Sequence, residues 1–349
     1  MRPRVCFIAH PGAGRNAFAR VWPAMAEALQ VAGVDHEVVI TEGPAHATAL
    51  ARDAVTDGAR LVAAVGGDGT LHEVVNGVVG GADRAPDGVM VGLVPAGRGS
   101  DYARGLGLDA APGPLAERFA RALEGDPAAA RRVDLGEVTY RPSPLVAGRP
   151  APEDVGERLG GPAERADEQA RRIFVNEAGI GFSPFVAQRT ARFPARLGAW
   201  LYTVAGIVTI IDWRHRMLEL VWDGELGGDR PAGSGSPTGA EAHYASVEVA
   251  LGRFAGGGML LAPGSVLDDG LFDVVTIGEA GRRELLSFSW RLRSGAHLSS
   301  SVVEVRRTAA LSVRVTDDRG PVYLQADGEL LGRDPVAFRI LPDALVFAG

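Results

Sequence analysis

The 349-residue chain contains no lysine, because all 36 of its basic residues are arginine. Any site that commonly uses a lysine must therefore use an arginine, which offers a planar, bidentate group in place of a point charge. The formal net charge is -7, so the chain lacks the basic field that collects nucleic-acid phosphates. This charge balance argues against a nucleic-acid-binding protein.

Cysteine and long apolar runs are also scarce. Cys6 is the only cysteine, so no disulfide can form within the chain. It lies in the apolar run Val5–Ala9, which at about five residues is too short for a secretory signal. The uncharged stretch Leu197–Ile211 is shorter than the roughly 20 residues of a transmembrane helix. We therefore expect a cytoplasmic protein without a transmembrane helix.

The N-terminal part has an alternating strand and helix pattern, and the apolar content of 46% is typical of globular proteins. The pattern predicts strands at Val5–Ala9, Val38–Thr41, Leu61–Val65 and Val89–Val94, and helices at Ala17–Val31, Ala45–Thr56 and Leu115–Glu124. Such alternation predicts an α/β domain with a doubly wound parallel sheet over residues 1–133.

The remainder of the chain has mainly short strand-like runs. They lie at Val133–Tyr140, Arg172–Asn176, Met217–Trp222, Ala245–Leu251, Phe272–Ile277, Ser301–Arg306, Ala310–Val315 and Val322–Ala326. Because no helix is expected between the runs after residue 260, they predict a β-sandwich domain over residues 134–334. Two segments rich in Gly, Pro and charge, about 141–171 and 224–243, are expected to be mobile insertions. Two further strands, Val336–Ile340 and Ala344–Phe347, are expected in a segment, 335–349, that returns to the first domain.

The most informative stretch is Leu61–Gly77, in which a buried strand leads through a glycine turn into a helix. Glycine lets the backbone approach a ligand closely, and the unpaired N–H groups at a helix N-terminus favour a phosphate. Asp68, the one charge in the turn, would either hold a metal ion or accept a proton from an attacking hydroxyl. A tight turn with an aspartate cap is the structural alternative.

Three other loops are expected at the same edge of the sheet, since ligands bind beyond the carboxyl ends of parallel strands. They are 10–15, 41–45 and 95–101, and together with 66–70 they could surround one triphosphate.

Five motifs occur in an order found in one protein family. They are GGDGTLHEVVNG (66–77), PAGRGSDYARGLG (95–107), FVNEAGIGF (174–182), RFAGGGMLLAPGSVLDDGLFDVV (253–275) and QADGE (325–329). Together they resemble the catalytic domain of diacylglycerol kinases and sphingosine kinases, with the bacterial soluble lipid kinases looking most similar. The first motif alone is shared with NAD kinases.

The resemblance implies an NAD-kinase-like domain and a lipid-binding β-sandwich, with ATP and Mg²⁺ in the cleft. The γ-phosphoryl group would pass in line to a lipid hydroxyl, a reaction that depends on positioning and charge neutralisation. The residues implied in nucleotide binding are Gly12, Gly14, Arg15, Thr41, Gly66, Gly67, Gly69, Thr70, Gly97, Arg98 and Glu329. Asp68 and Asp327 are rival candidates for the general base: the bacterial relatives slightly favour Asp327, and the sphingosine kinases favour Asp68.

Asp268 and Asp269 match a turn where some bacterial relatives bind a structural Mg²⁺, although two acids beside a glycine are also an ordinary turn.

The chain departs from the family pattern at two loops. The first loop usually opens with asparagine and here has His10, and the family's Gly-Thr-x-Asn-Asp is replaced by residues 97–101, GRGSD. Arg98 and Arg15 could supply compensating charge to phosphates. Alternatively, Arg98 pairs with Asp101 or points outward, or nucleotide binding is weakened.

Residues 189–216 combine apolar and aromatic side chains at helical spacing with flanking arginines at 189, 192, 196, 214 and 216. The apolar stripe consists of Phe193, Leu197, Trp200, Leu201, Val204, Val208 and Ile211. This composition fits a peripheral element drawn to anionic lipid, the wall of an acyl pocket, or a helix packed on the sandwich.

The sequence therefore predicts an ATP- and Mg²⁺-dependent kinase of a lipid such as diacylglycerol or a sphingoid base, peripheral to the inner membrane face. The rival predictions are an NAD kinase and a non-catalytic relative that binds nucleotide or lipid. A homodimer is compatible with the sequence, which also leaves the nucleotide preference open.

Overall fold

The computed structural model describes residues 4–12, 17–97, 99–142, 169–190, 200–222 and 239–349. The chain divides into two compact units, each described below by itself. Unit 1 contains Met1–Leu135, Leu267–Asp269 and Leu341–Gly349, and unit 2 contains Gly136–Val266 and Gly270–Ile340. The sequence-based borders were 133/134 and 334/335; the contacts within the chain instead divide it after Leu135 and Ile340 and assign Leu267–Asp269 to unit 1.

Unit 1 is built on a parallel sheet. Its strands are β1 (Arg4–Ala9), β2 (Glu37–Ile40), β3 (Ala59–Gly66), β4 (Met90–Pro95) and the end of β17 (Glu329–Ala348). They lie in the order β2-β1-β3-β4-β17, and residues 346–348 of β17 pair with residues 90–92 of β4. β1, β3 and β4 are almost fully buried, which explains their uninterrupted apolar sequences.

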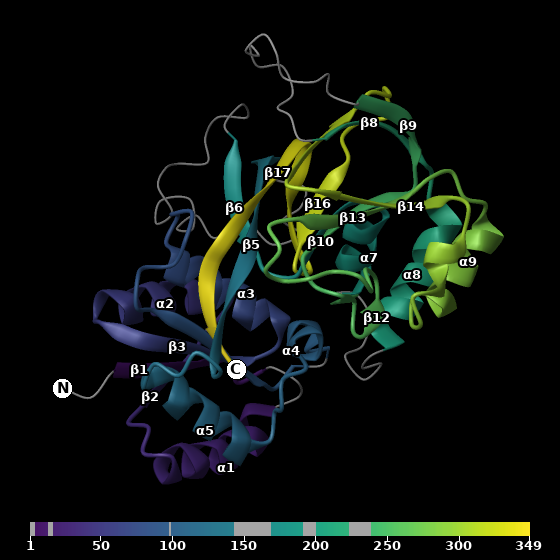
Figure 1. The fold of residues 1–349 in the computed structure, drawn as a ribbon. Helices are drawn as coiled ribbons and strands as arrows, with labels where there is room; N and C mark the ends of the chain where they lie inside the picture. The colour runs from purple at the N-terminus through teal and green to yellow at the C-terminus, as the bar shows by residue number, and fades with distance from the viewer. Residues whose placement is uncertain (1–3, 13–16, 98, 143–168, 191–199, 223–238) are drawn as a thin grey trace. The chain divides into compact units, whose positions relative to one another are not determined.

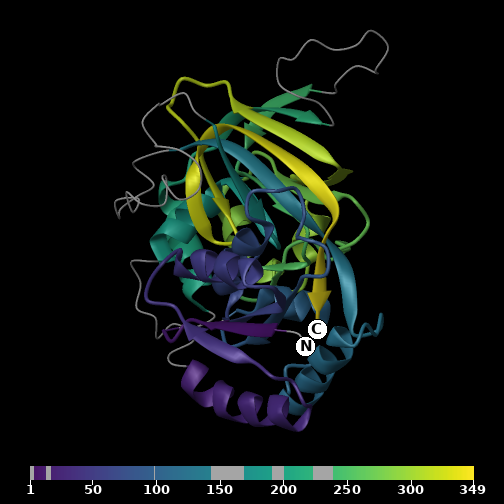
Figure 2. The ribbon, with the colours of Figure 1, turned by 90° about the vertical axis from the view of Figure 1, so that its left-hand side faces the viewer.

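Helices cover both faces of this sheet. They are α1 (Ala17–Val31), α2 (His46–Thr56), α3 (Asp68–Val79), α4 (Asp101–Leu106) and α5 (Pro112–Leu123). Figures 1 and 2 show α1 below the strands; in Figure 1 α5 lies on the same side and α2 and α3 lie on the other. Phe7 of β1, Met25 of α1 and Phe119 of α5 lie in the core between the sheet and these two helices. The predicted doubly wound α/β class is confirmed.

Unit 2 is mainly an antiparallel structure. Its strands are the later part of β5 (Ala130–Pro142), β6 (Ala170–Phe174), β7 (Glu177–Gly181), β8 (Arg216–Trp222), β9 (Gly239–Tyr244), β10 (Ser246–Ala250), β11 (Phe254–Ala255), β12 (Met259–Leu260), β13 (Phe272–Ile277), β14 (Val303–Thr308), β15 (Ala310–Val315), β16 (Tyr323–Ala326) and the first part of β17. One path through the sheet runs β14-β13-β10-β7-β16-β17, and β15 joins β17 to the hairpin β8–β9. Phe174 stacks on Phe272, with ring centroids 5.8 Å apart, and meets Phe338 edge-on.

Unit 2 also contains helices, which corrects the prediction of strands alone after residue 260. Helix α9 (Arg282–Arg291) and the short 3-10 helix η2 (Ala296–Ser299) lie between β13 and β14, and α7 (Phe182–Thr190) and α8 (Trp200–Asp212) precede β8. Leu285 and Phe288 of α9 pack in one apolar cluster with Ile210 of α8. The helix α9 was missed because only a few of its ten residues are apolar and buried.

Three local predictions also need correction. Strands β5 and β6 extend to Pro142 and from Ala170, so the ends of the expected first insertion are strand, and residues 143–168 lie outside the described residues. Residues 239–243, expected in the second insertion, belong to β9, whose alanines opposite β8 give little apolar signal. β17 is a single strand where two were expected.

Candidate functional site

Four loops follow the carboxyl ends of the parallel strands in unit 1. Backbone hydrogen bonds hold three of them to neighbouring strands: Thr41 N–H donates to Ala9 O (2.9 Å), Ala96 N–H to Gly66 O (2.7 Å), and His10 N–H to Val65 O (3.3 Å). The described residues at the start of these loops therefore lie along one edge of the sheet.

His10 takes a defined place in the first loop. Its Nδ1 lies 2.9 Å from Thr41 Oγ1, and the Thr41 residue is buried, at 5% exposure. A Cβ on Gly12 would lie 3.3 Å from His10 Nε2, so the loop folds back over the imidazole ring. The histidine thus links the loops after β1 and β2. Gly14 and Arg15 lie outside the described residues.

The glycines after β3 and β4 bring two loops into contact. A Cβ on Gly67 would lie 3.0 Å from Gly97 Cα, and a Cβ on Gly66 would lie 2.7 Å from Thr70 Cβ. Close packing therefore explains why positions 66, 67 and 97 have glycine and no larger residue. Gly69 is different, because a Cβ there would meet nothing within 4 Å. Arg98 lies outside the described residues.

Asp68 begins α3 and receives the backbone of the β4 loop. Its Oδ2 accepts a hydrogen bond from Asp101 N–H and its Oδ1 one from Tyr102 N–H, both 3.1 Å long. These donors are the first N–H groups of α4, whose orphan amides are thereby satisfied. The Asp101 carboxylate pairs with Arg104, at 2.8 Å, within the same helix. The aspartate of the altered GRGSD loop therefore supports α4.

The N-terminus of α3 offers amides to a ligand. Gly69 and Thr70 donate no backbone hydrogen bond to any residue that the structure describes, as expected for the first turn of a helix. Gly69 is exposed to solvent and Thr70 is half-buried. The positive end of the α3 dipole and these amides together form a site suited to an anion.

Glu73 of α3 is a residue near the site that was not identified from the sequence. Its carboxylate accepts hydrogen bonds from Ala45 N–H and Ala47 N–H, each 3.0 Å long. Ala45 has a left-handed φ of 62° and supplies no side-chain cap to α2. Glu73 therefore caps a neighbouring helix. Its position within the motif GGDGTLHEVVNG (66–77) is the sequence feature that could have indicated this residue.

Asp327 lies in unit 2, at a turn between β16 and β17 with φ 48°. Its carboxylate accepts three backbone hydrogen bonds, from Val175 (2.9 Å), Asn176 (2.9 Å) and Glu177 (3.1 Å). Asp327 N–H in turn donates to Glu177 O at 2.8 Å. The QADGE motif therefore holds the FVNEAGIGF motif through its backbone.

Other polar residues reinforce the connection between these two motifs. Gln325 Nε2 donates to Glu177 Oε2 at 2.8 Å, and Gln325 Oε1 accepts from Gly328 N–H at 2.9 Å. Glu329, a predicted nucleotide residue, forms an ion pair with Arg172 at 3.2 Å. The partners Glu177, Gln325 and Arg172 were not identified from the sequence.

Strand β10, which pairs with β7 of the FVNEAGIGF motif, contains a buried acid, Glu248. Its side chain contacts Ser246 through a hydrogen bond to the serine hydroxyl. Burial raises the pKa of the Glu248 carboxyl to about 7, because desolvation disfavours the charged form.

Asp268 and Asp269 belong to a turn within unit 1. Asp268 forms an ion pair with Arg131 at 3.2 Å, and Asp134 N–H donates to Leu267 O at 2.7 Å. Within the described ranges, no group of three or more His, Cys, Asp and Glu residues is placed to hold a metal ion. The Mg²⁺ site at Asp268 and Asp269 stays a prediction.

Comparisons with known proteins agree with these motifs. A model of the diacylglycerol kinase catalytic domain matches residues 4–138, and the YegS C-terminal NAD kinase beta sandwich-like domain matches residues 176–348. The diacylglycerol kinase of Bacillus subtilis (strain 168) is 24% identical over 336 residues, covering 96% of this chain and 92% of that protein. The diacylglycerol kinase of Staphylococcus saprophyticus is 24% identical and covers 97% and 92%.

Solved structures share the fold. Two structures from Bacillus anthracis str. Sterne cover 99% of this chain at TM-scores of 0.69 and 0.63, with 17% and 16% sequence identity. They are covered to 94% and 96% of their own length, and the second is described as a diacylglycerol kinase. The chain therefore belongs to the diacylglycerol kinase catalytic-domain family of lipid kinases, with the YegS-type β-sandwich as its second domain. The resemblance seen in the sequence is confirmed.

Proposed function

We propose that the chain is a kinase that transfers the γ-phosphoryl group of ATP to the hydroxyl of a lipid, with diacylglycerol as the first acceptor to test. The observation that carries this proposal is the N-terminus of α3, where Gly69 and Thr70 present unpaired amides beside Asp68. Relatives named diacylglycerol kinase support the acceptor.

The phosphate site is proposed at the carboxyl edge of the unit 1 sheet. The amides of Gly69 and Thr70 would donate to phosphate oxygens, and the α3 dipole would favour their negative charge. The absence of a side chain at Gly69 has no packing cause, so close approach of a ligand explains it. The His10–Thr41 pair would border the same site.

The transfer forms a bond between the lipid hydroxyl oxygen and the γ-phosphorus and breaks the bond to the β–γ bridging oxygen. The hydroxyl proton must go to a base, and Asp68 and Asp327 remain the two candidates. Each carboxylate also holds backbone amides, two for Asp68 and three for Asp327. Whichever of the two takes the proton would therefore also position a loop.

Mg²⁺ would supply charge neutralisation on the phosphates, and this ion commonly binds through the nucleotide with only one or two carboxylates. Because Asp268 pairs with Arg131, we assign no step to a metal at that turn.

Access to a membrane lipid is proposed through α8. Val208 and Ile211 are 36% and 62% exposed, whereas Ala205, Thr209 and Ile210 on the same helix are buried. Two apolar residues of the predicted stripe are therefore available to an interface. Phe193 and Leu197 lie outside the described residues. In the part of the chain that the structure describes, no helix has the length and hydropathy of a membrane span.

The test is a phosphoryl-transfer assay with purified protein and γ-labelled ATP. Diacylglycerol vesicles should yield labelled phosphatidic acid, and NAD should yield no labelled product. Label in NADP alone would identify an NAD kinase, and ATP binding without transfer to a lipid extract would identify a non-catalytic relative. Either result would overturn the proposal.

Variants of the two candidate bases test whether the activity depends on the proposed site. Of Asp68→Asn and Asp327→Asn, the variant that removes the general base should lower kcat at least about a hundredfold. Asp87→Asn is the matched control, because this exposed residue pairs only with Arg84 on the surface. If both candidate variants kept the parental kcat, neither acid would take the proton.

A further inference from the structure

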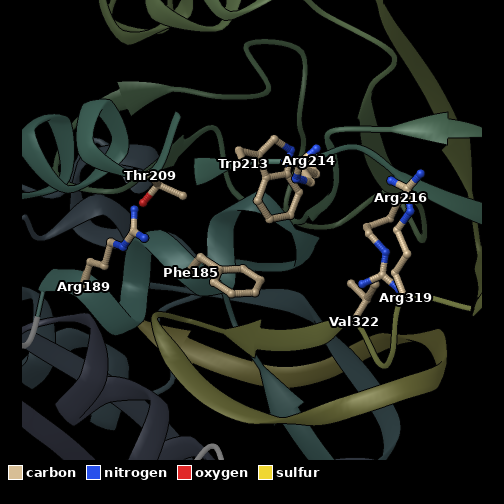
Figure 3. A pocket seen from close by; sticks show the side chains of 8 residues that line it. All are labelled: Phe185, Arg189, Thr209, Trp213, Arg214, Arg216, Arg319 and Val322. Carbon is tan, nitrogen blue, oxygen red and sulfur yellow. The ribbon is translucent and has the colours of Figure 1, made fainter. Parts of the chain in front are cut away.

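A cavity in unit 2 is lined by four arginines. Its volume is about 250 Å³, and its lining residues are Phe185, Arg189, Thr209, Trp213, Arg214, Arg216, Arg319 and Val322. They come from α7, from α8 and the residues after it, and from the loop between β15 and β16. Figure 3 shows the rings of Phe185 and Trp213 between Arg189 on one side and Arg216 and Arg319 on the other.

All of the charged residues that line this cavity are basic. None of the eight lining residues is acidic, although the chain as a whole has a net charge of -7. Three of the lining arginines, at positions 189, 214 and 216, flank the apolar stretch that the sequence assigns to a lipid interface, an acyl-pocket wall or a helix packed on the sandwich. In the structure they line a common space.

Arg216 is neutralised within the protein. Arg216 forms a bidentate pair with Asp317, in which the shortest distance is 2.7 Å. The side chains of Arg216 and Asp317 are only 12% and 15% exposed, and hydrogen bonding from Arg216 holds the pKa of the Asp317 carboxyl well below its usual range. This pair fixes the start of β8 and needs no ligand.

Arg214 and Arg319 have no such partner. No carboxylate in the described residues lies within ion-pair distance of either guanidinium. The Arg319 backbone N–H donates to Asp317 Oδ1 at 3.0 Å, and its guanidinium contacts the backbone oxygen of His215 at 3.4 Å. Two guanidinium groups at one cavity are well suited to the oxygens of a phosphate, which they bind in a bidentate manner.

Trp213 supplies an independent observation. Its indole Nε1–H is buried and has no acceptor among the described residues, while its ring packs edge-on against Phe185 at 5.4 Å. A buried donor without a partner is unfavourable, and a ligand oxygen in the cavity would satisfy it.

We propose that this cavity binds the phosphate group of a phosphorylated ligand, at a site separate from the nucleotide loops of unit 1. The volume is below the roughly 300–1,000 Å³ of sites that enclose a whole drug-sized ligand, so the cavity accommodates a headgroup rather than a complete two-chain lipid. Phe185, Trp213 and Val322 provide apolar contact for the group attached to the phosphate.

The proposal is tested by calorimetry on the full chain without nucleotide. Three probes share the phosphate: inorganic phosphate, glycerol 3-phosphate, and dioctanoyl phosphatidic acid below its micelle concentration. Saturable binding of at least one probe is expected. Tighter binding of the lipid would identify a lipid headgroup as the source, and equal binding of all three would identify a soluble phosphate.

Variants assign the binding to this cavity. Arg214→Ala and Arg319→Ala should each raise Kd about tenfold, as loss of a charge-assisted hydrogen bond does. Trp213→Phe should weaken binding about threefold, since it removes one donor and keeps the ring. Arg283→Ala is the matched control, at an exposed position of α9 outside the lining.

The proposal fails if no probe binds at millimolar concentration, or if the Arg214→Ala and Arg319→Ala variants bind as the parent does. Thermal melting of each variant, measured alongside, separates loss of binding from loss of folding. A charge-preserving Arg319→Lys variant that melts normally and retains part of the affinity would support the assignment to charge.

Discussion

At the scale of single residues, Cys6 illustrates how burial determines reactivity. The residue is 1% exposed in β1, and burial raises the pKa of its thiol to about 12. Because the thiolate is the reactive form, a thiol reagent should label the native protein very slowly and the urea-unfolded protein completely. Fast labelling of the native protein would show that β1 opens locally.

Glu248 should make stability depend on pH. Its pKa in the folded chain is about 7, against about 4.3 in an unfolded chain. Between these values the folded chain holds a proton that the unfolded chain releases, so stability falls as pH rises, by up to about 1.4 kcal/mol per pH unit.

The Glu248→Gln variant should flatten this part of the pH dependence, because the amide is neutral throughout. Urea unfolding at several pH values between about 4 and 8 measures the effect, with the exposed Glu117→Gln as control. An unchanged pH dependence in the Glu248→Gln protein would mean that the carboxylate is ionised in the folded chain across this range.

At the scale of elements, α3 contains two glycines with opposite roles. A Cβ on Gly77 would lie 2.7 Å from Ala51 Cβ in α2 and would overlap the Thr48 backbone. Gly77→Ala should therefore destabilise unit 1 by about 1–3 kcal/mol. Gly69 is in open space, so Gly69→Ala should leave stability unchanged or raise it by up to about 1 kcal/mol.

The Gly69→Ala and Gly77→Ala variants should also differ in their enzyme kinetics. Gly69→Ala should raise the KM for ATP about tenfold, because the methyl group stands where the phosphate approaches the α3 amides. Melting curves and steady-state kinetics of both proteins provide the measurement. An unaltered KM in Gly69→Ala would remove the α3 N-terminus from the nucleotide site.

The proposed contact with a membrane surface depends on the exposed residues of α8. The double variant Val208→Asp/Ile211→Asp should reduce cosedimentation with anionic vesicles at least about tenfold, since each apolar side chain buried at an interface contributes over 1 kcal/mol. Leu286→Asp, which alters an exposed residue of α9, should bind vesicles as the parent does. Equal binding by all three proteins would exclude α8 as the interface.

Elements of both units were predictable from sequence where their patterns are local. The helix over 17–31 and the strands β13 and β15 occur at the predicted residues, where apolar spacing and glycine turns agree. Elements with small or polar residues, such as α4 and β9, have too little apolar signal.

The site was predictable in its motifs and not in its contacts. The glycine turn identified Asp68, but its bonds to residues 101 and 102 depend on two loops meeting in space. The same holds for Asp327, whose amide partners lie about 150 positions earlier in the chain. The gathering of the cavity arginines could not be predicted, because helical spacing does not reveal the loop between β15 and β16 that lines the same cavity.

At the scale of the whole molecule, unit 1 depends on the last residues of the chain. Val346–Ala348 pair with β4, Phe347 packs against Tyr102 with ring centroids 5.4 Å apart, and Ala85 N–H donates to Ala344 O at 2.8 Å. Leu341, Leu345 and Phe347 are buried.

Removing residues 341–349 should therefore unfold unit 1, because burial of each large apolar side chain contributes roughly 1.5–3 kcal/mol to a net stability of only about 5–15 kcal/mol. Circular dichroism and proteolysis measure the loss. Deleting Gly349 alone is the control and should be nearly neutral. A truncated protein with native melting would contradict the role of the closing strand.

The same closing strand determines when unit 1 can be completed during synthesis. The segment that covers the open edge of β4 follows every residue of unit 2, so the N-terminal sheet stays unfinished until Leu341–Gly349 have been made. Unit 2 has all of its residues before that moment, since its final residue, Ile340, precedes the closing segment. A nascent chain that lacks this segment therefore exposes an unpaired β4 edge, which is open to pairing with a strand of another chain.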